Sequence, residues 1–242
     1  MTVKPYDTAR SKKEEVRDMF DRIAPRYDLL NHTLSLSIDR LWRRRVVREV
    51  RRGSPARVLD MATGTGDLAI ELARRLPGVH VTGVDLSERM LAEAQRKVAQ
   101  RGLTGRIDLR QGDAEHPASE AGVFDAATVA FGVRNFGDLD AGLRGLAGAL
   151  RPGGRIVILE FSRPRNRLFR VLYEFYTRRI LPLVGGAVSH DRRAYAYLPA
   201  SVEAFPAPEA FLERLAQAGF RDCRARSISG GIAQIYVGKV RP

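Results

Sequence analysis

Acidic side chains stand on either side of a glycine-rich turn in the first half of the chain. Asp60 ends a short apolar run, and Gly64 and Gly66 follow it, separated by one residue. A second apolar run ends in Asp85, about 20 residues beyond the turn. Glycine lets the backbone approach a ligand closely, and a helix that begins there directs free N–H groups at it. A carboxylate at Asp85 would bind the ribose hydroxyls of an adenosine cofactor, unless it only caps the next helix.

The glycines alone leave the cofactor class open. Gly64-x-Gly66-x-x-Ala69 fits the dinucleotide pattern, an S-adenosylmethionine site fits equally well, and a turn without a ligand is the third alternative. Asp60 favours S-adenosylmethionine, because a carboxylate beside the turn would repel a pyrophosphate and attract ammonium and sulfonium groups. Asp113 follows a third apolar run and could accept the adenine amino group.

Alternating strands and helices must position these residues. Strands are predicted over 57–61, 79–85, 107–111, 124–131 and 155–161, and helices over 67–76, 88–101, 139–150 and 209–218. This alternation requires a parallel sheet with helices on both faces. Two further runs, 220–228 and 232–240, are close in sequence and should pair antiparallel.

Two helices are predicted before this core. Apolar residues recur at helical spacing from residue 13, and Pro25 is expected to end or kink that helix. A second helix is predicted over 36–52, with Ile38, Trp42 and Val46 as its apolar stripe and arginines on its other faces. Such a basic amphipathic helix either lies on acidic lipid or packs on the core with a solvated basic face.

The composition restricts the class of protein. A chain of 242 residues with 44% hydrophobic residues suits one large α/β domain with attachments. The single cysteine, Cys223, excludes an intrachain disulfide framework, and the four histidines show no metal-ligand spacing. Neither a signal peptide nor a membrane-spanning run is expected. The net charge of +13 predicts an anionic partner (nucleic acid, acidic lipid or a charged substrate), or it reflects an arginine-rich composition.

Several motifs resemble those of class I methyltransferases. They are Asp60-x-Ala-Thr-Gly-Thr-Gly66, Gly83-Val-Asp-Leu-Ser87, Gly112-Asp-Ala114, Ala130-Phe-Gly-Val-Arg-Asn135 and Leu150-Arg-Pro-Gly-Gly154. Two further motifs make the chain resemble, more narrowly, the ubiquinone/menaquinone biosynthesis C-methyltransferases. These are Phe20-Asp-Arg-Ile-Ala-x-x-Tyr27-Asp-x-Leu-Asn31 and Tyr195-Ala-Tyr-Leu-Pro-x-Ser201. The resemblance covers residues 12–240, almost the whole chain.

The resemblance implies an α/β fold of the class I S-adenosylmethionine-dependent methyltransferase type, which is Rossmann-like. Its sheet would be seven-stranded and mostly parallel, with an antiparallel C-terminal strand. A helical extension over 1–52 would cap the site of a nucleotide-binding core over 53–162. An apolar and basic substrate cover is expected over 163–198, and residues 199–242 would complete the core with a helix and antiparallel strands.

The implied cofactor is S-adenosyl-L-methionine, and no metal is expected. The predicted cofactor-binding residues are Asp60, Thr63, Gly64, Gly66, Asp85, Leu86, Asp113 and Ala114. The implied reaction is methyl transfer to a ring carbon of a polyprenylated quinol, so Cys223 is not needed as a nucleophile. Arg134 and Asn135 are expected to stabilise the developing phenolate, and Tyr27 is expected to close the site from the N-terminal segment.

The acceptor stays open between a naphthoquinol and a benzoquinol. Ala130 stands where many members of the family carry serine, which favours the menaquinone branch. The lipid tail and the basic charge predict a cytoplasmic enzyme bound peripherally to the inner face of the cell membrane, alone or as a homo-oligomer.

Three other activities fit parts of the pattern less well. An RNA methyltransferase, and with it a nucleic-acid partner, is disfavoured because Ala130-Phe-Gly-Val-Arg-Asn135 replaces the Asn/Asp-Pro-Pro-aromatic motif that acts on exocyclic amino groups. A basic binding protein with a decayed cofactor site is disfavoured by the intact Asp85 and Asp113. A small-molecule O-methyltransferase would have no use for an apolar cover.

Overall fold

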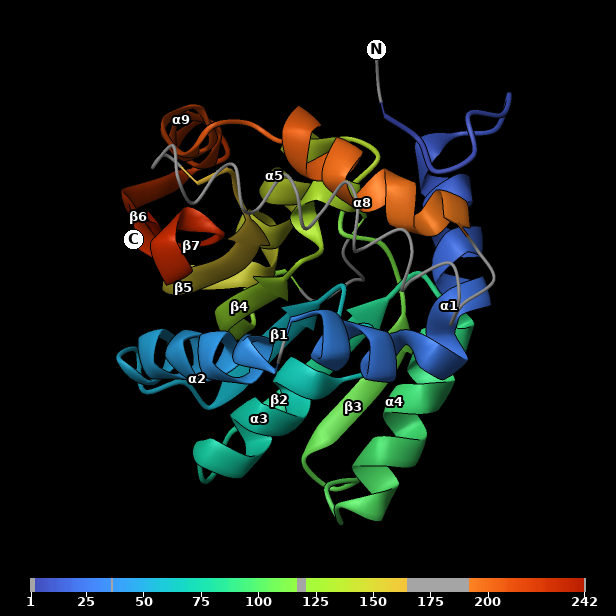
Figure 1. Ribbon diagram of the computed structural model, residues 1–242. Helices are drawn as coiled ribbons and strands as arrows, with labels where there is room; N and C mark the ends of the chain where they lie inside the picture. Colours follow the sequence, from blue (N-terminus) through green and yellow to red (C-terminus); the bar gives the residue numbers. More distant parts are fainter. Residues whose placement is uncertain (1–2, 36, 117–120, 165–191, 242) are drawn as a thin grey trace.

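A seven-stranded sheet forms the centre of the computed structural model, which describes residues 3–35, 37–116, 121–164 and 192–241 (Figure 1). Its strands are β1 (Arg57–Met61), β2 (His80–Asp85), β3 (Ile107–Gln111), β4 (Phe124–Ala130), β5 (Leu150–Phe161), β6 (Phe220–Ile228) and β7 (Ala233–Val240). The strand order is β3-β2-β1-β4-β5-β7-β6. β1 to β5 are parallel, and β7 pairs antiparallel with both β5 and β6. The predicted sheet and its antiparallel end are therefore confirmed.

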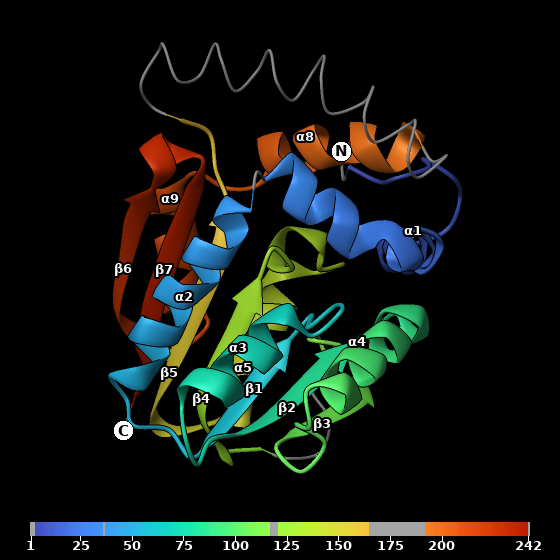
Figure 2. The ribbon, with the colours of Figure 1, turned by 60° about the horizontal axis from the view of Figure 1, so that its bottom comes forward.

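Helices cover both faces of this sheet (Figure 2). Those of the first half are α1 (Lys12–Leu34), α2 (Ile38–Arg51), α3 (Asp67–Arg75) and α4 (Glu88–Gln100). Those of the second half are α5 (Leu139–Ala149), α8 (Arg192–Ala204) and α9 (Pro208–Gln217), with 3-10 turns η1 (Val133–Asn135) and η3 (Ser229–Gly231). Successive strand residues face opposite sides: Val58 packs in the cluster with α2 and α3, and Leu59 in the cluster with α5 and α9. Because both faces are buried, these strands are continuously apolar.

α1 and α8 lie across the carboxyl end of the parallel strands (Figure 2). Val16, Met19 and Ile23 of α1 pack with Met90 of α4 and Tyr197 of α8 in a separate apolar cluster. Pro25 does not end α1, which continues to Leu34 and changes direction along its length (Figure 1). The loss of one N–H donor at a proline is enough to bend a helix without ending it. The N-terminal extension thus covers the edge where open α/β sheets bind ligands.

α2 packs on the core, which is one of the two arrangements that its basic amphipathic pattern allowed. Trp42, Val46 and Val47 are buried against the sheet, and Trp42 Nε1 donates to Ser229 Oγ over 2.8 Å. The arginines of the opposite face are exposed, so the helix packs on the core with a basic outer face. None of the helices in the described ranges is both long and apolar enough to span a bilayer.

Most of the predicted substrate cover, residues 165–191, lies outside the described part of the chain. The rest of the predicted organisation can be followed in Figure 1. The core over 53–162 holds β1 to β5. β6 and β7 extend the same sheet rather than forming a second one, and α9 packs against them.

Leu72 tests the packing between α3 and the sheet. The side chain is fully buried, so Leu72→Ala is expected to lower the free energy of unfolding by about 2–5 kcal/mol. Trp42 is the only tryptophan, and its fluorescence in urea gives the measurement. Leu41→Ala is the matched control because Leu41 is 53% exposed, and it should change stability by less than about 0.5 kcal/mol. Equal losses in the two variants would contradict the packing described.

Candidate functional site

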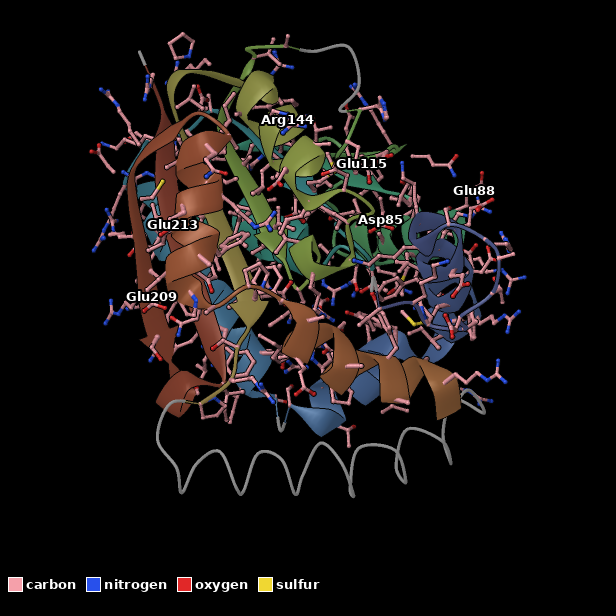
Figure 3. All side chains as sticks on the ribbon, turned by 90° about the horizontal axis from the view of Figure 1, so that it is seen from above. Asp85, Glu88, Glu115, Arg144, Glu209 and Glu213 are labelled. Carbon is pink, nitrogen blue, oxygen red and sulfur yellow. The ribbon has the colours of Figure 1, made fainter. Side chains whose placement is uncertain are left out.

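A pocket opens where the carboxyl ends of β1, β2 and β4 meet the underside of α1. Its lining includes Gly64 and Asp85 from the predicted cofactor side, together with Tyr27 and Asn135 from the predicted acceptor side. Figure 3 shows Asp85 beside α1 at this end of the sheet. The topology therefore brings together residues that are far apart in the sequence.

The two glycines of the turn have different functions. Gly64 has φ +56° and a Cβ there would meet nothing within 4 Å, so this position is open toward the pocket. Gly66 has φ +80°, and a Cβ there would come within 3.1 Å of Ala94 Cβ. Gly66 thus allows α3 and α4 to pack closely, and it is not part of the pocket lining. The left-handed φ explains why glycine is favoured at both positions.

Asp85 shapes the turn and faces the pocket at the same time. One carboxylate oxygen accepts the N–H of Gly64 over 2.8 Å, and the other accepts the N–H of Ser87 over 2.9 Å. Ser87 in turn caps α4 by accepting the N–H of Met90. Burial raises the pKa of Asp85. Because a carboxylate offers about four lone-pair sites, the two N–H bonds leave acceptors free for ligand hydroxyls.

Asp60 and Thr63 lie behind the pocket and are not in its lining. The two Asp60 oxygens accept the hydroxyls of Thr63 and Thr128, each over 2.6 Å. Burial raises the pKa of Asp60 to about 6. The structure therefore shows these residues joining β1 to β4 beneath the turn, and their predicted contact with a cofactor remains a prediction.

Asp113 and Ala114 line the pocket at the end of β3, as does Leu86 beside Asp85. Asp113 is ion-paired with Lys13 of α1 and accepts the N–H of Glu115 over 3.0 Å. Burial alone would raise the pKa of Asp113, but these hydrogen bonds hold it below its ordinary value. Lys13 was missed by the sequence analysis.

The acceptor side of the pocket is neutral and aromatic. Tyr27 packs edge-on against Phe20, with ring centroids 6.1 Å apart. Burial raises the pKa of Tyr27 to about 12, so the phenol stays protonated at neutral pH. Asn135 is buried, its amide donates to Phe131 O over 3.4 Å, and its oxygen accepts the hydroxyl of Tyr197 over 3.1 Å. Both candidates can therefore present polar groups to a ligand from an apolar wall.

The backbone is strained at two points of the lining. Ala62 and Phe131 have φ values of 54° and 59°, a conformation that costs energy outside glycine. They follow β1 and β4, the two central strands of the site. A Cβ on Gly132 would lie 2.6 Å from Ala62 Cβ, so the two strand ends pack backbone to backbone.

Arg134 lies behind the loop that carries Asn135, and it is not in the pocket lining. Its guanidinium is paired with Glu160 over 2.8 Å, donates to Phe131 O and contacts Ser201 Oγ over 3.3 Å. The Arg134 side chain is 8% exposed, and Glu160 is fully buried. Arg134 therefore joins β4, β5 and α8, and direct contact with an acceptor ring is not what this geometry provides.

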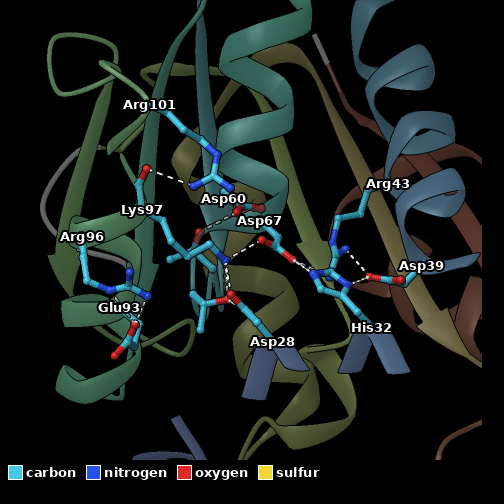
Figure 4. A network of polar contacts seen from close by, with 12 residues as sticks. Asp28, His32, Asp39, Arg43, Asp60, Asp67, Glu93, Arg96, Lys97 and Arg101 are labelled. Atoms are coloured by element: carbon cyan, nitrogen blue, oxygen red, sulfur yellow. Dashed lines mark hydrogen bonds and ion pairs between the residues drawn. The ribbon is translucent and has the colours of Figure 1, made fainter. Parts of the chain in front are cut away.

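A buried network of charges fixes α1 to the glycine turn (Figure 4). Lys97 of α4 is ion-paired with both Asp28 of α1 and Asp67 of α3. The Thr65 hydroxyl donates to Asp28 over 2.5 Å. Arg43 of α2 lies 3.2 Å from Asp67 and continues the network. Because Thr65 stands between the two glycines, the position of the pocket cover is coupled to the turn.

Two groups of acidic and histidine side chains are close enough to share a metal ion. One contains Asp39 and Asp67, and Arg43 is ion-paired with both. The other contains Asp113 and Glu115, and Lys13 is ion-paired with both. Protein cations thus already balance these carboxylates, and we assign neither group to a metal.

Comparison with known proteins gives consistent results. The model of the ubiE/COQ5 methyltransferase family matches residues 8–240. The chain is 49% identical over 229 residues to the protein of Geobacter sulfurreducens named ubiquinone/menaquinone biosynthesis C-methyltransferase UbiE. The aligned stretch covers 94% of this chain and 89% of the relative. It is 49% identical over 220 residues to the demethylmenaquinone methyltransferase of Thermus thermophilus, with 91% and 99% covered. Among solved structures, the [4+2]-cyclase SpnF has a TM-score of 0.69 at 18% identity, with 95% and 97% covered, and it shares the fold.

Asp60 gives a pH prediction. Its pKa is raised to about 6 by burial, so the folded state binds more protons than the unfolded state below that value. Stability contributed by Asp60 is therefore lost as the pH rises from about 4 to about 6. Asp60→Asn cannot ionise and should gain up to about 3 kcal/mol relative to the original chain between pH 4 and pH 7.

Urea unfolding at several pH values gives the measurement. Asp108→Asn serves as the control because its side chain, on the edge strand β3 of the same sheet, is 52% exposed. A difference between Asp60→Asn and the original chain that does not change with pH would contradict the assignment.

Proposed function

Because the chain belongs to the ubiE/COQ5 methyltransferase family, we propose that it methylates a ring carbon of a polyprenylated quinol. The favoured acceptor is demethylmenaquinol, which would make the reaction the last step of menaquinone biosynthesis. The names of two relatives, one at 49% and one at 45% identity, support this choice. The single observation that carries the proposal is the pocket itself, which Asp85 and Gly64 line together with Tyr27 and Asn135.

S-adenosyl-L-methionine is the cofactor, and the residues of the pocket fit it. Asp85 keeps free acceptor sites for the ribose hydroxyls, and Gly64 leaves space where a Cβ would project. Asp113 and Ala114 would hold the adenine ring at the end of β3. The sulfonium of the bound cofactor supplies an already activated methyl group. No side chain is therefore needed as a nucleophile, which agrees with the position of Cys223 in β6.

The residues of this chain would orient the acceptor and stabilise its negative charge. In the quinol, the attacking carbon becomes nucleophilic when the neighbouring hydroxyl loses its proton. Once the carbon carries the methyl group, it would release its ring proton and the oxygen would be protonated again, so that one proton is released for each methyl group transferred. Tyr27, with its pKa raised to about 12 by burial, would donate a hydrogen bond to that oxygen. Asn135 would hold the ring from the opposite strand end. Correct alignment of the acceptor is worth up to about 7–11 kcal/mol in such a bimolecular step.

Arg134 enters this proposal as a positioning residue. It fixes η1, and with it Asn135, through its pair with Glu160. Its positive charge also lowers the pKa of Tyr27 against the effect of burial. The same charge would favour a phenolate on the acceptor without touching it.

A lipid-tailed acceptor and a net charge of +13 favour work at a membrane surface. We therefore propose that the enzyme is cytoplasmic and binds peripherally to the inner face of the cell membrane. The benzoquinol of ubiquinone biosynthesis is the second candidate acceptor, because the relative from Geobacter sulfurreducens carries both pathways in its name.

Methyl transfer from labelled S-adenosylmethionine tests the proposed reaction. Reduced demethylmenaquinone and the reduced benzoquinone precursor are supplied in detergent as parallel acceptors. We expect label on the naphthoquinol; label on both rings would identify a dual-pathway enzyme. A chain that binds S-adenosylhomocysteine yet labels neither quinol would contradict the acceptor class, and RNA would be tested next.

Tyr27→Phe tests the acceptor side without opening a cavity. Loss of one hydrogen bond to a developing oxyanion is expected to lower kcat about 10- to 100-fold, with the affinity for S-adenosylhomocysteine unchanged. Tyr6→Phe removes a hydroxyl outside the pocket and is the matched control. Unchanged kcat in Tyr27→Phe would remove this phenol from the chemistry.

A further inference from the structure

In the part of the chain that the structure describes, the exposed large apolar side chains all fall in one stretch of the sequence. Leu29 is 63% exposed, Leu41 is 53% exposed and Ile38 is 38% exposed. All three lie where α1 ends and α2 begins, and we call them the α1–α2 corner. Single exposed apolar residues are ordinary, but the grouping of all three at one junction needs a physical reason.

Arginines continue the outer face of α2 from this corner. Leu41, Arg44, Arg45 and Arg48 recur at the spacing of one helical face, and all of them are exposed. Arg44 lies 3.5 Å from Glu71. Among the described residues, Arg40, Arg45 and Arg48 have no acidic partner. The surface therefore combines exposed apolar side chains with cations that no acidic side chain in the described ranges neutralises.

The exposure of the corner is fixed by the interior beneath it. Ser37 has φ 58°, and its N–H donates to His32 O over 2.8 Å, which makes the connection between the helices tight. Asp39 accepts the Ser35 hydroxyl over 2.7 Å and is ion-paired with Arg43 in the buried network of Figure 4. The helices cannot rotate to hide Leu29 or Leu41 without breaking these contacts.

The corner is close to the cover of the pocket. Figure 2 shows the junction of α1 and α2 at the same end of the molecule as α8, above the carboxyl ends of the strands. Val16, Phe20 and Tyr27 of α1 line the pocket on one side of this helix. Leu29 projects from the same helix to the outside.

We propose that the α1–α2 corner docks the protein on an anionic lipid surface. Leu29, Ile38 and Leu41 enter the boundary between headgroups and acyl chains, and Arg40, Arg45 and Arg48 meet the phosphates. A few apolar side chains beside cations suit this boundary, whereas a stable protein interface needs a larger apolar centre that is poor in charge. Docking here would bring the pocket cover to the membrane, so this inference deepens the proposed function and rests on it for its purpose.

Flotation of the full chain with vesicles tests the docking surface. Wild-type protein should float with phosphatidylcholine vesicles that contain phosphatidylglycerol, float poorly with phosphatidylcholine alone, and be released by salt. Leu29→Ser/Leu41→Ser and Arg45→Glu/Arg48→Glu should each lower the partition coefficient about tenfold or more. Trp42 fluorescence in urea checks that both variants fold.

Arg144→Glu/Arg221→Glu is the matched control for net charge. Arg144 lies on α5, on the side of the molecule away from α1 and α2 (Figure 3), and Arg221 lies in β6. This control should float like the wild type. If it loses binding as strongly as Arg45→Glu/Arg48→Glu, net charge rather than the corner controls binding, and the proposal is wrong.

Methylation of two acceptors separates this inference from the proposed function. Leu29→Ser/Leu41→Ser should keep wild-type turnover of a short-tailed, water-soluble quinol, and should lose about tenfold on a long-tailed quinol in anionic vesicles. Corner variants that float and work in vesicles like the wild type would overturn the docking surface alone. Failure of wild-type protein on every quinol would overturn the proposed acceptor while leaving the flotation result to decide the corner.

Discussion

The closed site depends on one buried cation, the ammonium group of Lys97. It is ion-paired with Asp28 of the covering helix and with Asp67 at the start of α3, and only 6% of the residue is exposed. Removing one partner of such a buried pair costs about 3–5 kcal/mol, because the remaining charge is left uncompensated. α1 therefore has one favourable position relative to the glycine turn. The pair thus specifies geometry more than it adds stability.

The floor of the pocket is built from backbone, whereas its cover is built from side chains. The floor is made by backbone at the ends of parallel strands, where Ala62 and Phe131 accept left-handed φ values. Close approach of the strands leaves no room for a Cβ on Gly132. The cover is made by side chains of α1, held by Lys13 on Asp113 and by the Lys97 network. The pocket thus lies between a backbone floor and an ion-paired cover.

The sequence was sufficient to predict the sheet and part of the pocket lining. Alternating strands and helices bring strand ends to one edge, so Asp85 and Asp113 could be placed at that edge from the sequence alone. Asp60 and Arg134 could not be placed, because a side chain beside a strand end can point into the site or behind it with the same local pattern. Partners that are distant in the sequence decide which way each side chain points. Asp60 accepts the hydroxyl of Thr128, and Arg134 is ion-paired with Glu160.

The position of Arg134 behind the loop has an electrostatic reason under the proposed reaction. Two like charges about 4 Å apart at the effective dielectric of a protein repel by about 4 kcal/mol, so a guanidinium directly beside the sulfonium would oppose binding of the cofactor. Pairing with Glu160 balances the guanidinium and keeps it out of the lining. The neutral groups of Tyr27 and Asn135 then face the acceptor, while the charge of Arg134 still reaches the phenol of Tyr27. Arg17 of α1 already lines the pocket, and the site can favour an anionic acceptor without adding the guanidinium of Arg134 to that lining.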